Sequence, residues 1–325
     1  MRRAIITWSV AAAVVLASFA GTVLILNASL YSAGGFVRSY LDSLVRHDAD
    51  GALELADIGS TAVAGLASRE LLAPAAMGEL SDIHLVSDVE AGGVHRVTFS
   101  YTADGVDGTS TFEVERAGTL LGLFPTWQFA TSPLAVIQLS VLHATDFTVN
   151  GVDLSAAEQD LASPYLVFTP GTYSFSHDSK YLHAATLPVT VTHPSGSTVA
   201  ALDVQANSTF VDAVQDEING YLDDTCVPQQ VLLPAGCPFG QEIANRTVSA
   251  PQWSMSQYPE VTLQPGPEPA SWLMPPTEGA AHLVVDVQSL FDGSISPFDD
   301  DVPFTASYLV TFLPDGQLLV TGRYE

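Results

Sequence analysis

Lysine is almost absent from this 325-residue chain, which contains only Lys180. Lysine and arginine together number 10, whereas aspartate and glutamate number 36, so the formal net charge is −26 at pH 7. All the acidic residues follow residue 30. A surface of this sign repels the phosphates of nucleic acids and anionic lipid headgroups. The composition therefore argues against a nucleic-acid partner, and it favours either simple solubility or the attraction of cations and basic partners.

Cysteine is also scarce, with Cys226 and Cys237 as the only two in the chain. The short loop between them carries Pro228, Pro234 and Gly236, which suit a tight closure. Outside the cytoplasm, an even and closely spaced pair of cysteines usually forms a disulfide. Metal binding is the alternative, but companion ligands are missing. We expect a Cys226–Cys237 disulfide and no metal site.

Short catalytic motifs are missing as well. The chain has no G-x-S-x-G elbow, no H-E-x-x-H zinc motif, no Walker loop and no G-x-G-x-x-G. Lys180 does not complete an S-x-x-K motif, because His177 stands three residues before it. We therefore predict no catalytic residue, no cofactor and a protein that is not an enzyme.

A long uncharged segment is present near the start of the chain. Residues 4–26 carry no charge, and a helix of that length covers ~34 Å, enough to cross the ~30 Å hydrocarbon core of a bilayer. Arg2 and Arg3 precede it, and basic flanks stay in the cytoplasm. We expect residues 1–30 to form a short cytoplasmic N-terminus and a single-pass transmembrane helix in the cell membrane, with the C-terminal ectodomain outside. A signal peptide cleaved after Ala20 is the alternative.

The residues after this segment divide by pattern. In residues 31–133, apolar positions at helical spacing come before alternating strands, which predicts an α+β module of helices followed by an antiparallel meander. In residues 134–194, alternation and turn signals such as Asn150-Gly151 predict a small β-sandwich. We expect a multi-domain α+β protein.

Residues 195–325 predict a second α+β module that contains the disulfide loop. Its helix is expected to begin with a capping box at Thr209. Residues 264–276 hold five prolines in thirteen positions, so we predict an extended loop that does not pair inside a sheet. Trp272 and its neighbours in this loop either pack back on the module or form an exposed contact for a partner or the membrane.

Two polar clusters are candidates for chemistry. The densest group of histidines could act as a metal or acid–base site, with a polar turn as the alternative; its members are His177, Asp178, Lys180 and His183. The second cluster could hold Ca²⁺ through carboxylates, but it lacks the D-x-D-x-D-G spacing, so we expect a solvated acidic loop; its members are Asp292, Asp299, Asp300 and Asp301.

Aromatic residues of the first module allow a further alternative. Cone-shaped modules offer a concave sheet face that can hold an apolar ligand. Alternating aromatics are also what the core of a sheet needs, and we favour the core. The residues concerned are Phe99, Tyr101, Phe112 and Trp127.

The layout resembles known families. The helix-then-meander order and the opening FVRSYLDSLVRHDADGALELAD resemble the nuclear-transport-factor-like or cystatin-like modules of exported bacterial proteins. The whole chain is similar to a group of uncharacterised actinobacterial proteins with a single membrane anchor, through Phe168-Thr169-Pro170-Gly171-Thr172-Tyr173 and Cys237-Pro238-Phe239-Gly240. A remote likeness is to teicoplanin-resistance-associated membrane proteins. The resemblance implies stacked extracellular modules and no catalytic residue.

We therefore expect a non-catalytic, membrane-anchored extracytoplasmic protein that binds a protein, a cell-wall component or a small ligand. Its expected partners are the membrane, through the N-terminal helix, and a protein or wall component of the cell envelope. One alternative is a cell-surface hydrolase that uses acidic residues. Another is a sensor or regulator of cell-envelope stress.

Overall fold

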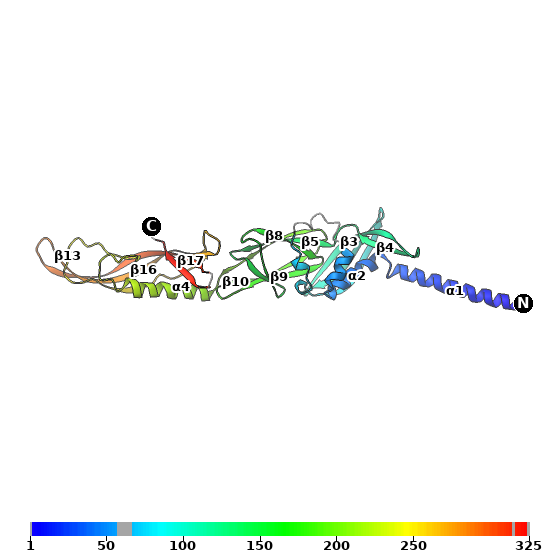
Figure 1. Cartoon of the computed structure of the whole chain (residues 1–325), viewed down its shortest axis with the longest axis horizontal. Helices are drawn as coiled ribbons and strands as arrows, with labels where there is room; N and C mark the ends of the chain where they lie inside the picture. Colours follow the sequence, from blue (N-terminus) through cyan, green and yellow to red (C-terminus); the bar gives the residue numbers. More distant parts are fainter. Residues whose placement is uncertain (1, 57–66, 314–315, 324–325) are drawn as a thin grey trace. The chain divides into compact units, whose positions relative to one another are not determined.

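The computed structural model describes residues 2–56, 67–313 and 316–323, of which residues 2–7 and 9–11 by their backbone alone. The fold is a mixture of α-helices and antiparallel sheets (Figure 1). It divides into two compact units. The first comprises Met1–Ser176 and Thr186–Leu202, and the second comprises His177–Ala185 and Asp203–Glu325. The predicted α+β class is confirmed.

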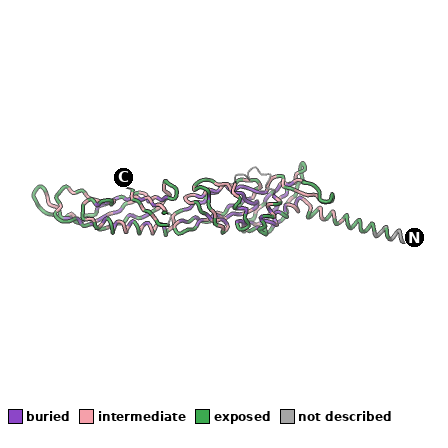
Figure 2. The backbone as a smooth tube through the Cα atoms, viewed as in Figure 1, coloured by how far each residue is buried: buried purple, intermediate pink, exposed green. Residues whose placement is uncertain are grey.

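Helix α1 (Arg2–Ala28) covers the uncharged segment. Its side chains from residue 12 to residue 28 are exposed or half-buried (Figure 2). Among the described residues, no helix taken alone has the length and apolar composition of a membrane span. Ala12–Ala28 and Ala33–Val45, which meet at a 58° bend, satisfy that test as a pair, by length and composition only.

Helices α2 (Ala33–Val45) and α3 (Ala49–Ala56) open the folded part of the first unit. The hydroxyl of Ser32 caps α2 by accepting a hydrogen bond from the backbone N–H of Gly35 at 2.9 Å. The apolar stripe predicted for this helix is buried, with Tyr40 and Leu41 fully enclosed. Two short 3₁₀ turns, Glu70–Leu72 and Pro74–Ala76, lead from α3 toward the sheet.

The predicted meander is a four-stranded antiparallel sheet in the order β1-β2-β3-β4. Its strands are β1 (Leu80–Ala91), β2 (Val94–Ala103), β3 (Val106–Leu120) and β4 (Phe124–Phe129). Alternate side chains of β2 and β3 point toward α2, as a period of two requires. Rings of Tyr40 and Phe112 meet edge to face with centroids 6.0 Å apart. The helix therefore covers one face of the sheet and leaves the other open.

The next strands form two sheets, most of whose residues belong to the same unit. One has the order β11-β5-β8, and the other places β10, β9, β6 and β7 side by side. Their bounds are Leu134–Leu142 (β5), Asp146–Val149 (β6), Val152–Ser155 (β7), Ala162–Phe168 (β8), Gly171–Asp178 (β9), Leu182–Val191 (β10) and Ser197–Asp203 (β11). The predicted turn Asn150-Gly151 joins β6 to β7 with positive φ at both residues.

The boundary predicted at residues 133 and 134 falls inside the first unit. Leu134 and Phe168 belong to the same hydrophobic cluster as the helices and meander. The Tyr40 hydroxyl donates to the carbonyl of Thr169 at 3.0 Å, and the amide of Asn150 donates to the carbonyl of Ala76 at 2.8 Å. The two predicted modules therefore share one core.

The second unit is built on helix α4 (Ser208–Tyr221) and a long hairpin of β16 (Ser271–Gln288) and β17 (Ile295–Phe312). A π-helical turn, Leu222–Cys226, continues α4 to the predicted disulfide, Cys226–Cys237, which is confirmed. Short strands complete the unit; they are β12 (Gln205–Ala206), β13 (Arg246–Thr247), β14 (Gln252–Gln257), β15 (Gln264–Pro265) and β18 (Leu318–Gly322).

Two predictions for the second unit were wrong. Asn207, not Thr209, caps α4, because its side chain accepts the backbone N–H of Phe210 at 3.0 Å. The proline-rich segment is not an unpaired loop, since residues 271–276 belong to β16, which pairs with both β15 and β17. A register shift between Met274 and Thr277 accommodates the prolines, which lack the N–H that a regular ladder requires.

Candidate functional site

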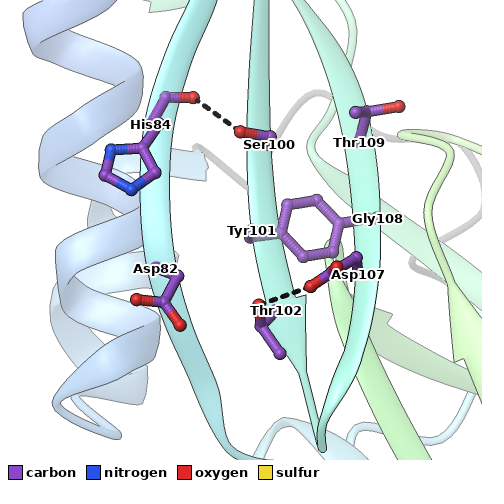
Figure 3. Close-up of a pocket in the computed structure, with 8 residues that line it drawn as sticks. All are labelled: Asp82, His84, Ser100, Tyr101, Thr102, Asp107, Gly108 and Thr109. Carbon is purple, nitrogen blue, oxygen red and sulfur yellow. Dashed lines mark hydrogen bonds between the residues drawn. The ribbon is translucent and has the colours of Figure 1, made fainter.

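An open groove lies on the first sheet, across β1, β2 and β3 (Figure 3). Its volume is about 510 Å³. Most of the residues that line it have polar side chains; the lining residues are Asp82, His84, Ser100, Tyr101, Thr102, Asp107, Gly108 and Thr109. Its lining carries more hydroxyl and carboxylate groups than a depression beside Glu217 and Tyr221 or one beside Pro238 and Thr305.

The pairing of β2 with β3 places four of these side chains in two rows. Ser100 lies opposite Thr109, and Thr102 lies opposite Asp107. Directly paired residues point to the same face of a sheet. This face is the one that α2 leaves open. The Thr102 hydroxyl donates to a carboxylate oxygen of Asp107 at 2.8 Å, which orients both groups at the edge of the groove (Figure 3).

An irregularity in β1 adds an imidazole and a second carboxylate. The register of β1 against β2 shifts between Ser81 and His84. Asp82, inside this bulge, has a φ of 51°, which turns the backbone locally. His84 then lies opposite Ser100, whose hydroxyl donates to the His84 carbonyl at 3.5 Å.

Beneath the groove, on the opposite face of the sheet, lie a buried ring and a glycine. Tyr101 is 3% exposed, and its hydroxyl and that of Ser110 are hydrogen-bonded at 2.9 Å. A Cβ at Gly108 would lie 2.8 Å from a ring carbon of Tyr101, so glycine leaves the space that the ring occupies. Burial of the ring raises the pKa of the Tyr101 hydroxyl. Tyr101 therefore belongs to the core behind the groove and offers no charge to a ligand.

The side chains of the groove can both donate and accept hydrogen bonds. Hydroxyls donate and accept, carboxylates accept, and imidazole does either, according to its tautomer. Within the described part of the chain, none of the hydrogen bonds joins the ring of His84 to a carboxylate. The groove therefore carries hydrogen-bonding groups that are not joined into a catalytic pair; Thr102 meets Asp107, and Ser100 meets the His84 carbonyl.

The histidine cluster predicted near residue 180 does not converge on one point. His177 is buried, and its Nε2 lies 3.1 Å from the Ser179 hydroxyl. His183 is exposed and lies 3.7 Å from Asp178. The ammonium of Lys180 lies over the Tyr181 ring, 4.4 Å from its centroid. Each side chain has its own local environment, as in the polar turn that was the alternative.

Three members of the acidic cluster lie on a strand, so the prediction of a loop was wrong for them, whereas Asp292 lies in the turn before that strand. Asp299 and Asp301, two residues apart on β17, point to the same face, where both meet His282 of β16. Asp300 pairs with Leu283 on the other face, and Asp292 accepts hydrogen bonds from Ser294 in the connecting turn. In the described ranges, no group of acidic, histidine or cysteine residues could hold a metal ion.

His282 is flanked by carboxylates at both ring nitrogens. Its Nδ1 lies 2.9 Å from Asp301, and its Nε2 lies 2.9 Å from Asp299. Carboxylates only accept hydrogen bonds, so both ring nitrogens must donate, which favours the charged imidazolium. The hydrogen bond with Asp301 raises the pKa of His282, and the contact with Asp299 adds to it. The same bond lowers the pKa of the Asp301 carboxyl.

We expect the β16–β17 hairpin to become less stable as the pH rises through the pKa of His282. A histidine with a raised folded pKa contributes its full stabilisation below the unfolded value of about 6.5, and that contribution is lost as pH rises through the folded pKa. An NMR titration of the His282 ring should give a midpoint above 6.5 that falls in Asp301→Asn. Asp300→Asn, with its carboxylate on the other face, is the control and should leave the midpoint nearly unchanged. Equal shifts in both variants would contradict the proposed pairing.

The aromatic residues form core, as favoured, and not an apolar ligand pocket. Phe99, Tyr101 and Phe112 are buried under α2, and Trp127 packs against the same cluster. In the second unit, Trp272 and Met274 are also buried, so the packed alternative for that segment is confirmed.

The sequence did not single out the groove residues Asp82, His84 and Asp107. In residues 98–102 and 109–111, every second residue is polar, and this pattern could have predicted that one face of the sheet is exposed. The bulge that brings in Asp82 and His84 left no signal in the pattern. The chain matches no protein-family model, no curated protein and no solved structure.

Proposed function

We propose that this chain is a membrane-anchored extracytoplasmic protein whose groove on β1–β3 binds a neutral, hydroxyl-rich ligand such as a cell-wall glycan. The observation that carries the proposal is the pair of rows in which Ser100 faces Thr109 and Thr102 faces Asp107. Rows of short polar side chains match the alternating donors and acceptors of a sugar. Two carboxylates in the groove disfavour an anionic ligand.

The placement in the membrane rests on α1 and its flanks. The uncharged residues 4–26 follow Arg2 and Arg3, which favours a span with the basic end in the cytoplasm. The disulfide suits an oxidising compartment. In this proposal the first unit is a cystatin-like cone joined to a small β-sandwich, and the second is another α+β module, as in the families that the chain resembles.

The ligand proposal is tested with wall polysaccharide and two matched double variants. Thr102→Val with Thr109→Val removes two hydroxyls from the groove, and we expect affinity to fall roughly 30-fold, because each hydrogen bond contributes about 1 kcal/mol. Thr98→Val with Thr111→Val removes a cross-strand pair on the same face that does not line the groove, and binding should persist. Binding lost equally in both variants, or absent in the unaltered chain, would refute the groove. Release of sugar fragments would favour the hydrolase alternative.

The single lysine allows a test of which side of the membrane the folded part occupies. Lys180 is exposed, so an amine reagent that cannot cross membranes should modify it on intact cells. The Lys180→Arg variant is the control for labelling of the terminal amine. Modification of Lys180 only after lysis would place the folded part inside the cell and refute the proposal.

A further inference from the structure

In the turn between β3 and β4, a leucine occupies a position whose backbone conformation disfavours leucine. Leu121 and Gly122 have φ values of 53° and 68°, and the N–H of Leu123 donates to the carbonyl of Leu120 at 3.1 Å. Turns with positive φ at both central positions prefer Asn, Asp or Gly there. A leucine in the left-handed region is uncommon. The choice of residue at this turn therefore points to a requirement other than folding.

The leucines of this turn are exposed to solvent. Leu121 is 82% exposed, and Leu120 and Leu123 are 47% and 44% exposed. Leu30, in the connection from α1 to α2, is 68% exposed. Single exposed leucines are ordinary, but several on neighbouring segments form a patch that marks a contact surface.

The turn is fastened beside the C-terminal end of α1 (Figure 1). The side-chain amide of Asn27, in the last turn of α1, donates to the carbonyl of Leu123 at 3.1 Å. The rings of Tyr31 and Phe124 stack with centroids 4.4 Å apart. The indole N–H of Trp127 donates to the carbonyl of Tyr31 at 2.8 Å. These contacts hold the leucines where the helix leaves the folded part of the unit.

The charge of this region differs from that of the rest of the chain. No acidic residue occurs from Arg116 to Thr145, although the chain has 36. The guanidinium of Arg116 lies over the Trp127 ring, 5.6 Å from its centroid. Tryptophan and tyrosine concentrate where membrane proteins meet the lipid headgroups. His95, whose ring packs against Trp127, meets the carboxylates of Asp88 and Glu90, but neither of these belongs to the turn. An apolar turn with aromatic neighbours, in a segment without acidic residues, has the composition of a membrane-interface contact.

We propose that the Leu120–Leu123 turn, with Leu30, inserts into the surface of the bilayer beside α1 as a second membrane contact. The inference rests on the proposed function, because it needs α1 to cross that bilayer. The occupant is the apolar part of the bilayer rather than a second copy of the chain, since the net charge of −26, which repels anionic headgroups, also makes copies repel one another, whereas acyl chains carry no charge. The contact would limit how freely the first unit swings about the end of α1.

The test uses the full chain in phosphatidylcholine vesicles that contain brominated lipid. A fluorescent amino acid replaces Leu121 in one preparation and Val199, which is 80% exposed in the same unit, in the other. A side chain ~5–10 Å deep in the headgroup region lies close to the bromines, so we expect roughly a two-fold loss of fluorescence at position 121 and none at position 199. Equal quenching, or none, at the two positions would overturn the proposal.

A second variant separates lipid contact from folding. With the fluorescent residue at position 120, Leu121→Asn should reduce quenching, while asparagine suits the left-handed backbone and keeps the turn. Val199→Asn is the matched control and should leave quenching unchanged. If protection from aqueous iodide appears without bromolipid quenching and grows with protein concentration, the turn contacts a second copy and the proposal is wrong.

Failure of the anchor is distinguished by washing the same vesicles. If carbonate removes the chain from the membrane, the proposed function fails together with this inference. If the chain stays and position 121 is not quenched, the anchor stands and only the second contact is refuted.

Discussion

Trp272→Ala is expected to destabilise the second unit by ~3–5 kcal/mol, the range for removing a buried aromatic side chain. Trp272 is 1% exposed, and its ring meets Phe210 of α4 edge to face with centroids 5.8 Å apart. Its strand is paired on both sides, with Pro265 of β15 and Val310 of β17 opposite this residue. The cavity would therefore open between the helix and the sheet, where neighbouring strands have little room to close it. A typical domain has only ~5–15 kcal/mol of stability in total.

The measurement is urea unfolding combined with amide hydrogen exchange, which reports each unit separately. We expect exchange to accelerate throughout β16 and β17, while the β1–β4 sheet keeps its protection. Val284→Ala, on the same strand but 38% exposed, is the control and should have a small effect. A loss below ~1 kcal/mol in Trp272→Ala would mean that the ring is not a core residue.

Replacing Cys226 and Cys237 together with serine is expected to cost about 3 kcal/mol, by the loop-entropy relation for a short closed loop. The loop that they close is held by further contacts. The Tyr221 hydroxyl donates to the carbonyl of Gly236 at 2.7 Å, and Gln229 bridges the loop through the carbonyl and the N–H of Ala235. Removing the disulfide raises the entropy of the unfolded chain. On folding, these hydrogen bonds alone would then have to hold the loop in place.

Comparison with the reduced protein checks the disulfide prediction. The double variant and the unaltered chain in reductant should unfold at the same urea concentration, below that of the oxidised chain. The double variant should not respond to reductant. An oxidised chain no more stable than the double variant would contradict the prediction.

Local patterns predicted much of this fold. The Asn150-Gly151 turn was predictable because positive φ at two adjacent positions has few sequence solutions. The helix with Tyr40 and Leu41 was predictable because its buried stripe recurs at a period of 3.6. The disulfide followed from the scarcity and spacing of cysteine. In each case, the deciding interactions join residues close together in sequence.

What the sequence did not predict depends on strand register. His282 meets Asp299 and Asp301 only because β16 and β17 pair over their full length. The groove needs the bulge that sets His84 opposite Ser100. The prolines near Trp272 argued locally against a strand, but the pairing of β16 with β15 and β17 overrode them through a single register shift. A strand register is a property of two distant segments, and neither contains it alone.

The core shared across residues 133 and 134 limits how this part of the chain can change in evolution. Cutting the chain at Pro133 would leave the Tyr40 hydroxyl without its acceptor at Thr169 and uncover the apolar surface that Phe168 fills. We therefore expect that recombination cannot move the helical half into another protein without loss of stability. Selection acts on both halves as one block, and a change on either side of the junction is expected to demand compensation on the other.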